Sequence, residues 1–501
     1  MTVLVLGNQL TREVGPVAAR PDEPVVMIEA DNLAGRLPYH PHKLVLVFSA
    51  MRHFRDGLRA AGRRVQYHET EEFAEGLRNH LAEHPGDDLI GMRPVAHGAA
   101  DKLQTVVESA GGNLTFVEND LFLSSPAQFE RWAGDREPPY RHEQFYRFLR
   151  RERGVLVTDG EPVGGEWNFD DKNRNPPEPA QIPPDTPTFE PDATTSAVID
   201  RVGRSFDGGD WAEAEPFRWP VTRSAALEAL ETFIDERLAA FGPTQDAMVA
   251  GDRTRYHSLL APLLNLGLLH PQEVVSRVVE AYETNDDVPI ESAEGFVRQV
   301  LGWREFLRHV YRETMPSLAK ANRFGASEPL PEFYWTGETE LACVADVVEG
   351  VRKHGYSHHI QRLMILSNFA LLYGVEPAAL NKWFQAAYVD AAHWVTTPNV
   401  IEMGLAAAGT FATKPYAASA NYIDRMSNYC DGCAYDPDAT TGEGACPFNA
   451  LYWDFLDTNQ ATLGDNPRLA LSYHHLENKD REAIRERAAT IRAANGDPQS
   501  D

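Results

Sequence analysis

Four cysteines are the residues whose types and spacing most directly suggest chemistry. Cys430 and Cys433 are separated by two residues, Cys446 follows after twelve more and precedes a proline, and Cys343 lies 87 positions before Cys430. Soft metal centres select thiolates, so the set could hold a tetrahedral zinc ion or a [4Fe–4S] cluster. Zinc sites more often use two CxxC pairs, so this spacing favours the cluster. Unliganded core thiols are the third interpretation, and disulfides are uncommon in cytosolic proteins.

Two adjacent histidines form a second candidate group. His358 and His359 begin a His-His-x-x-Arg pattern that ends at Arg362. An imidazole titrates near neutral pH and can pass a proton to a reacting group. From the residues alone, a pair of hydrogen-bonded interior histidines is the simpler interpretation.

The first part of the chain, residues 1–125, alternates strand and helix signals. Short apolar runs predict strands at 2–6, 24–28, 43–48, 65–68, 88–92 and 114–118, with an amphipathic helix at 51–61. Fully apolar strands separated by helices indicate a parallel, doubly wound α/β sheet. The turn after the first strand, at Gly7, lies where open α/β sheets bind ligands.

The rest of the chain divides into two parts. Residues 126–220 contain many prolines and predict an irregular interdomain linker. From Thr222 onward, apolar residues recur at helical spacing, for example from Leu227 to Leu238, from Phe296 to Val310 and from Ile360 to Tyr373. We therefore expect residues 221–501 to form a mostly α-helical domain.

Composition limits the function classes. The 501 residues are 43% apolar, and no apolar run reaches the length of a membrane helix. The chain starts directly in a strand signal without a basic leader, which predicts a cytoplasmic protein. The net charge of −27 argues against nucleic-acid binding, because DNA phosphates are attracted by positive surface. However, an excess of Asp and Glu together with only eight lysines suggests a surface adapted to high salt, where charges are strongly screened. A local arginine-lined cleft could then still bind DNA.

Several long motifs resemble the iron–sulfur bacterial cryptochromes and photolyases, the prokaryotic (6-4) photolyases also described as deoxyribodipyrimidine photolyase-related proteins. The resemblance covers nearly the whole chain. It is carried by the stretches 413–430 and 445–455, and by shorter motifs at 48–54, 162–169, 241–248, 302–306, 333–337 and 358–364.

The resemblance implies a photolyase/cryptochrome fold. An N-terminal α/β domain would hold an antenna, usually 6,7-dimethyl-8-ribityllumazine, and the helical domain would hold FAD and the [4Fe–4S] cluster. The implied reaction is the light-driven reversal of (6-4) pyrimidine photoproducts in UV-damaged DNA by a monomeric enzyme. A blue-light photoreceptor without repair and a light-independent iron–sulfur nucleic-acid binder are the alternatives.

The same resemblance assigns roles to individual residues. His359 would be the proton donor to the lesion, supported by His358, and Tyr416 and Tyr422 would lie on the lesion side. The residues implied for FAD are His257, Ser258, Leu259, Leu260, Gln299, Arg304, Arg362 and Asn421. Asp246 could hold a Mg²⁺ ion, mainly through water.

Electron transfer and the antenna complete the implied site. Trp383 and Trp335 match electron-transfer positions, whereas Phe384 stands where relatives can carry the more easily oxidised tyrosine. The antenna residues implied by the family are Gly7, Asn8, Gln9, Leu10, Glu29, His40 and Lys43. Relatives often have Asp at the position of Asn8, which weakens the inference of lumazine.

Overall fold

The computed structural model describes residues 1–178, 180–205 and 211–495. Its first domain is built on a five-stranded, all-parallel sheet with the order β3-β2-β1-β4-β5. The strands are β1 (Thr2–Val5), β2 (Val25–Ala30), β3 (Val65–Thr70), β4 (Asp88–Met92) and β5 (Asn113–Val117). In the central pairs, Val3 is in register with Val25 and Ile90. The predicted doubly wound sheet is confirmed.

Helices cover both faces of this sheet. They are α1 (Gly15–Ala19), α2 (Pro41–Ala60), α3 (Phe73–Glu83) and α4 (Ala99–Ser109), with the 3₁₀ segment η1 (Asp31–Arg36) after β2. Side chains on one face of the sheet, such as Leu4 and Val26, pack with Leu77 of α3 and Val107 of α4. Val3 points to the opposite face of the sheet and belongs to the larger core that continues into the helical half.

The predicted strand at 43–48 is wrong, because these residues lie inside α2. Pro41 occupies the first turn, and the His40 side chain caps the helix by accepting the His42 amide at 3.1 Å. A short apolar run cannot distinguish a buried strand from a buried helix. Here the run is one side of a 20-residue helix that packs between the sheet and the rest of the protein.

The segment 126–220 is more ordered than its composition predicted. It contains α5 (Pro126–Ala133), α6 (His142–Arg153), the hairpin of β6 (Val157–Thr158) and β7 (Glu161–Pro162), the 3₁₀ segment η2 (Asp170–Lys172), and α7 (Ala193–Ser205). Ser125 and Gln128 form a reciprocal capping box at the start of α5. Phe145 and Tyr146 of α6 are fully buried, so this helix is part of the core.

The remainder is helical, as predicted. Its α-helices are α8 (Arg223–Glu236), α9 (Leu238–Thr244), α10 (Ala261–Leu266), α11 (Pro271–Thr284), α12 (Ile290–Val297), α13 (Arg304–Thr314), α14 (Phe333–Thr336), α15 (Ala342–His354), α16 (Asn368–Tyr373), α17 (Pro377–Ala387), α18 (His393–Pro398), α19 (Ala420–Met426), α20 (Pro447–Thr458), α21 (Gln460–Leu463), α22 (Ala470–Leu476) and α23 (Arg481–Asn495). The π-helical segments η3 (Arg298–Trp303), η5 (Gln361–Ser367) and η6 (Asn399–Gly404) and the 3₁₀ segment η4 (Leu318–Lys320) connect them.

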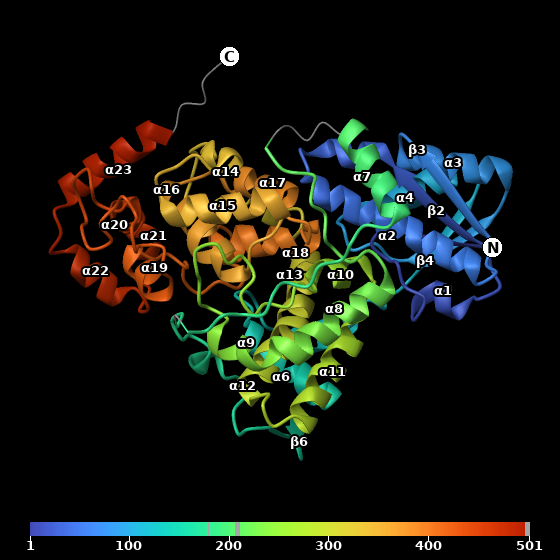
Figure 1. Ribbon diagram of the computed structural model, residues 1–501, viewed down its shortest axis with the longest axis horizontal. Coiled ribbons are helices and arrows are strands. Elements are labelled where there is room, and N and C mark those ends of the chain that lie inside the picture. Colours follow the sequence, from blue (N-terminus) through green and yellow to red (C-terminus); the bar gives the residue numbers. More distant parts are fainter. Residues whose placement is uncertain (179, 206–210, 496–501) are drawn as a thin grey trace.

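The two halves are in direct contact. The Leu10 amide donates to the Leu266 carbonyl at 2.8 Å, and the His40 amide donates to the Ala386 carbonyl at 2.9 Å. Figure 1 shows the sheet at one end of the molecule and the helices α20 to α23 at the other. Among the described residues, every helix is too short or too polar to cross a bilayer.

Candidate active site

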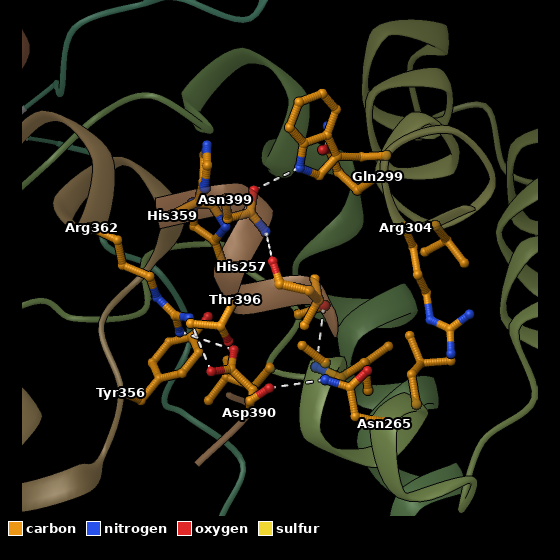
Figure 2. Close-up of a pocket in the computed structure, with 18 of the residues that line it drawn as sticks. His257, Asn265, Gln299, Arg304, Tyr356, His359, Arg362, Asp390, Thr396 and Asn399 are labelled. Atoms are coloured by element: carbon orange, nitrogen blue, oxygen red, sulfur yellow. Dashed lines mark hydrogen bonds and ion pairs between the residues drawn. The ribbon is translucent and has the colours of Figure 1, made fainter. Parts of the chain in front are cut away.

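One cavity in the helical half collects most of the residues expected to bind FAD. It encloses about 1370 Å³, including the part that is open to solvent. Its lining includes eight expected residues, His257, Ser258, Leu259, Leu260, Gln299, Arg304, His359 and Arg362. Figure 2 shows five of these among side chains that enter the cavity from separate elements.

Three π-helical segments form much of the wall. Each contributes lining residues, Gln299 and Trp303 from η3, Arg362 from η5, and Asn399 and Met403 from η6. The wider π turn displaces side chains from the regular helical positions, and such turns are frequent at functional sites. Three of them around one cavity indicate a wall shaped for a ligand.

Arg362 and Asp390 form a bidentate ion pair in the cavity wall. Arg362 Nη1 and Nη2 each lie 3.0 Å from a different oxygen of Asp390, and Arg362 Nε donates to the Ser357 carbonyl at 2.7 Å. Burial alone would lower the pKa of Arg362, but Asp390 raises it above its ordinary value. Because the guanidinium also lies 4.1 Å from the Tyr388 ring centroid, its orientation is fixed and it presents a permanent cation to the cavity.

The two adjacent histidines have different positions. His359 lines the cavity and is open to solvent through it, whereas His358 is fully buried and stacks on His257 with ring centroids 4.8 Å apart. The surrounding protein, together with Arg362, lowers the pKa of His359 to about 4. His359 is therefore neutral at pH 7 until a bound anion favours its charged form.

The loop before α10 has a strained backbone at the expected phosphate-binding position. Leu259 adopts a φ of +58°, a left-handed conformation that is uncommon for a residue with a side chain. The neighbouring Ser258 hydroxyl accepts the Leu260 amide at 3.3 Å, and His257 bonds the Gln245 carbonyl at 3.1 Å. Strain of this kind persists where surrounding structure holds it, often at ligand sites.

Asn421, which was expected to bind FAD, lies outside the lining of this cavity. Asn421 is exposed on α19 and does not line the cavity. The amide in the cavity is that of Asn399, whose Oδ1 accepts the Trp303 indole N–H at 3.0 Å. Sequence reasoning also missed Asp390. Its pairing with Arg362 spans 28 positions, so no local spacing could have revealed it.

A second group of expected residues lies near Asp246. Burial, followed by the charge of Asp170, raises the pKa of Asp246 to about 6, against the opposing effect of Arg174. The Asp246 charge in turn raises the pKa of Tyr422, after burial, and also acts on Tyr416. Tyr416 is 45% exposed. The Asp246 charge thus acts on both expected lesion-side tyrosines, of which Tyr416 is exposed and Tyr422 is half-buried.

Comparisons with known proteins show the family to which the chain belongs. Residues 3–219 match the sequence model of the family described as "Deoxyribodipyrimidine photo-lyase-related protein". The "(6-4) photolyase" of Agrobacterium fabrum is 42% identical over 481 residues, which are 94% of this chain and 94% of that protein. The chain belongs to the photolyase family.

Solved structures of photolyases and cryptochromes share its fold. A bacterial class III photolyase from Agrobacterium tumefaciens has a TM-score of 0.60 at 18% identity, covering 97% of this chain and 91% of that one. A cryptochrome from Synechocystis sp. PCC6803 has a TM-score of 0.59 at 14% identity, covering 97% and 98%.

The tryptophans expected to transfer electrons in this photolyase-family chain are neighbours. The ring centroids of Trp383 and Trp335 are 6.4 Å apart, and those of Trp335 and Trp211 are 5.0 Å apart. Phe384 lines the cavity, packs 5.1 Å from Trp383 and stacks on Tyr388 at 5.2 Å. Trp211 was not predicted, because it lies in the proline-rich segment, 124 positions before Trp335.

The four thiols are free and lie in one region. The pKa of Cys343 is raised, first by burial and then by Cys446, Cys430 and Cys433. Within the described ranges, no three His, Cys, Asp or Glu side chains are arranged as a closed metal site. The donor set itself, four thiols from α15 and the segment 430–446, has the chemistry that an iron–sulfur cluster requires.

Six of the seven expected antenna residues have protein partners or tight packing in the structure. Gln9 donates to the Met92 carbonyl at 3.1 Å, and a Cβ at Gly7 would lie 2.8 Å from Met51 Sδ. The buried Glu29 accepts two bonds from Arg52, and its neighbours include Arg201 and Tyr67. His40 and Lys43 face the helical half instead, where they bond the carbonyls of Arg352 and Gln385 at 2.9 and 2.6 Å. Leu10 is buried, whereas Asn8 is exposed.

Proposed function

We propose that this protein repairs (6-4) pyrimidine photoproducts in DNA by light-driven electron transfer from reduced FAD. The observation that carries the proposal is the cavity in which His359 and the Arg362–Asp390 pair face the same space as the loop at Ser258. The high identity to a protein named (6-4) photolyase supports it.

The cavity fits FAD by its chemistry. The loop at Ser258 and Leu259 offers a hydroxyl and backbone amides for a pyrophosphate, and Gln299 and Asn399 offer amide groups for ring heteroatoms. Arg362 would stabilise negative charge on the ring system. Reduced FAD, when bound there and excited by blue light, supplies the electron that splits the lesion.

The protein would supply the proton. Reversal returns a hydroxyl group from one base to the other, and His359 is the titratable group that we assign to this transfer. Its pKa of about 4 in the free protein means that it must gain a proton when the polyanionic substrate binds. His358 is a positioning residue, since it packs behind the cavity against His257.

The substrate would be a base extruded from damaged DNA, since a lesion inside a duplex cannot reach the cavity. Tyr416 and Tyr422 provide aromatic surface for it, and Asp246 could hold a hydrated Mg²⁺ ion nearby. Asn421 is exposed on α19 and lies outside the cavity lining, and we assign it to this surface.

Photoreduction would use the row of tryptophans. An electron that leaves Trp383 toward the cavity is replaced from Trp335 and then from Trp211, and a small thiol in solution reduces the last radical. The contacts at 6.4 and 5.0 Å support this order. Tyr388, stacked on Phe384, offers an oxidisable ring where Phe384 does not.

The remaining cofactors are also proposals. A [4Fe–4S] cluster held by Cys343, Cys430, Cys433 and Cys446 is supported by the donor set, four free thiols that α15 and the segment 430–446 supply. A lumazine antenna would bind near the turn at Gly7 to Leu10. Its polar contacts must replace those that Gln9, Glu29, His40 and Lys43 now make with protein.

Two measurements test the proposal. Chromatography of chromophores released from the purified protein is expected to yield FAD, and a defined (6-4) oligonucleotide is expected to be repaired under blue light. His359→Gln should retain FAD and lose repair. Bound FAD without repair by the wild type would instead indicate a photoreceptor, and the absence of flavin would overturn both functions.

A further inference from the structure

A hollow outside the FAD cavity carries four cations and no carboxylate. It encloses about 1170 Å³, including its part open to solvent, and its lining contains Arg141, Arg323, Lys414 and Arg468 but neither Asp nor Glu. We refer to these four residues as the basic hollow. The chain as a whole has 74 acidic against 47 basic residues, so the local charge is opposite to the global one.

The four cations lack acidic partners. Arg468 Nη1 donates to the Thr413 hydroxyl at 2.9 Å, and Arg323 Nη2 lies 3.5 Å from the Thr462 carbonyl, both neutral groups. Throughout residues 1–178, 180–205 and 211–495, none of the four lies within ion-pair distance of a carboxylate, whereas arginines such as Arg312 and Arg485 do. Like charges gathered in a concave surface repel one another and attract an anion.

One loop holds the four cations together. The Tyr140 amide donates to the Thr410 carbonyl, the Arg323 amide to the Ala407 carbonyl, and Asn466 Nδ2 to the Thr413 carbonyl, each at 2.9 Å. The segments that carry Arg141, Arg323 and Arg468 are thus tied to residues 407–413, which continue directly to Lys414.

This loop is itself fixed by one buried carboxylate. Glu402 accepts the amides of Ala408, Gly409, Phe411 and Ala412 at 2.8 to 2.9 Å. The basic hollow is therefore held in place before any ligand arrives, which lowers the entropic cost of binding.

The loop also joins the basic hollow to the FAD cavity. Phe411 packs on Trp303 with ring centroids 5.6 Å apart, and Trp303 lines the cavity. On the other side, Lys414 and Pro415 lead to Tyr416, whose side chain is 45% exposed. A nucleic-acid strand whose damaged base enters the cavity would carry its neighbouring phosphates across this surface.

We infer that the basic hollow binds the phosphodiester backbone of the DNA strand beside the lesion. The inference rests on the proposed DNA substrate, and it explains how a protein with a net charge of −27 could hold a polyanion. Phosphate contacts position a strand without reading its sequence. The hollow should therefore act equally on damaged and undamaged DNA.

The test uses the full-length holoprotein and fluorescence anisotropy of labelled oligonucleotides, with and without a (6-4) lesion, at several salt concentrations. Lys414→Gln, Arg468→Gln and the double variant remove charge from exposed side chains that the core does not need. Arg64→Gln and Lys102→Gln change the same charge on exposed positions of the sheet domain.

Each hollow variant is expected to weaken binding of both oligonucleotides. The logarithm of the association constant decreases linearly with the logarithm of the salt concentration. This slope should become less steep by about 0.7 to 0.9 for each phosphate that the variant no longer neutralises. Arg468→Lys should retain the wild-type slope, and all variants should retain the FAD content of the wild type. The Arg64 and Lys102 controls should match the wild type.

Two results would overturn the inference. One is a wild-type slope and affinity in the double variant. The other is stabilisation by inorganic phosphate that depends on the hollow while DNA binding does not, which would indicate a small-anion site. If the wild type binds DNA through the hollow but repairs nothing, the proposed reaction fails and this inference stands.

Discussion

Arg362 and Asp390 form an ion pair in the wall of the cavity that we propose for FAD, with both N···O distances at 3.0 Å. They come from η5 and from the turn before α18, and the Asp390 side chain is only 9% exposed. The pair fixes the orientation of the Arg362 guanidinium, which we propose stabilises negative charge on the flavin ring.

Asp390→Asn should therefore impair cofactor binding. The variant leaves a partly buried cation without its counter-ion. We expect the binding free energy of FAD to become less favourable by about 2 kcal/mol, which raises its dissociation constant roughly 30-fold. Titration of FAD against the apoprotein measures it. Glu349→Gln removes a carboxylate from an exposed pair with Lys353 and should leave the affinity unchanged. Equal affinities for Asp390→Asn and the wild type would show that Arg362 does not hold the ring.

The tryptophan row predicts where photoreduction can be interrupted. Trp335→Phe breaks both ring contacts, at 6.4 Å to Trp383 and 5.0 Å to Trp211, so flavin photoreduction should fall to a small fraction of the wild-type yield. Trp211→Phe should shorten the lifetime of the tryptophan radical seen by transient absorption, because the charge stays closer to the flavin. Trp453→Phe, on α20, serves as the control. A normal radical lifetime in Trp211→Phe would exclude Trp211 from the path.

Buried histidines predict a loss of stability in acid. Burial lowers the pKa of His40 to about 3, of His42 to about 4 and of His309 to about 2, against an ordinary value of 6.5. The unfolded chain therefore binds more protons below pH 6.5, and the free energy of unfolding must fall as the pH falls through this range.

His309 allows the effect to be measured at one position. Its ring stacks on Phe129 at 4.7 Å, its Nε2 lies 2.9 Å from the Ser124 hydroxyl, and Arg308 and Arg312 oppose its protonation. His309→Gln should reduce the difference in unfolding free energy between pH 7 and pH 5 by about 2 kcal/mol. Urea unfolding at both pH values measures this difference. His474→Gln, at an exposed position, should not change it, and an unchanged difference in His309→Gln would contradict the assignment.

The thiol set predicts the metal content. Cys430→Ser should lower the iron and acid-labile sulfide of the purified protein from about four equivalents to near zero, and lower the melting temperature, because the proposed cluster would join α15 to the segment 430–446. Tyr435→Phe removes a hydroxyl bond to Glu340 in the same segment without removing a thiol, and should retain the iron. One equivalent of zinc in the wild type would favour the tetrahedral zinc site.

The sequence alone determined the class of fold, the family and most of the cavity. Alternating apolar runs specify a parallel sheet, because strands buried on both faces need apolar residues throughout. Short continuous motifs, such as His358 to Arg362, can be recognised from local spacing. Their residues stay close in space because they lie within about one helical turn.

Tertiary structure decided what local spacing cannot encode. Asp390 meets Arg362, Trp211 meets Trp335, and Asn399 lines the cavity while Asn421 does not, because packing brings together segments distant in the chain. The basic hollow has the same origin, since its cations come from separate segments that one loop ties together. The net charge of the sequence sums all residues without their positions, so only the fold could reveal a cationic surface on an acidic protein.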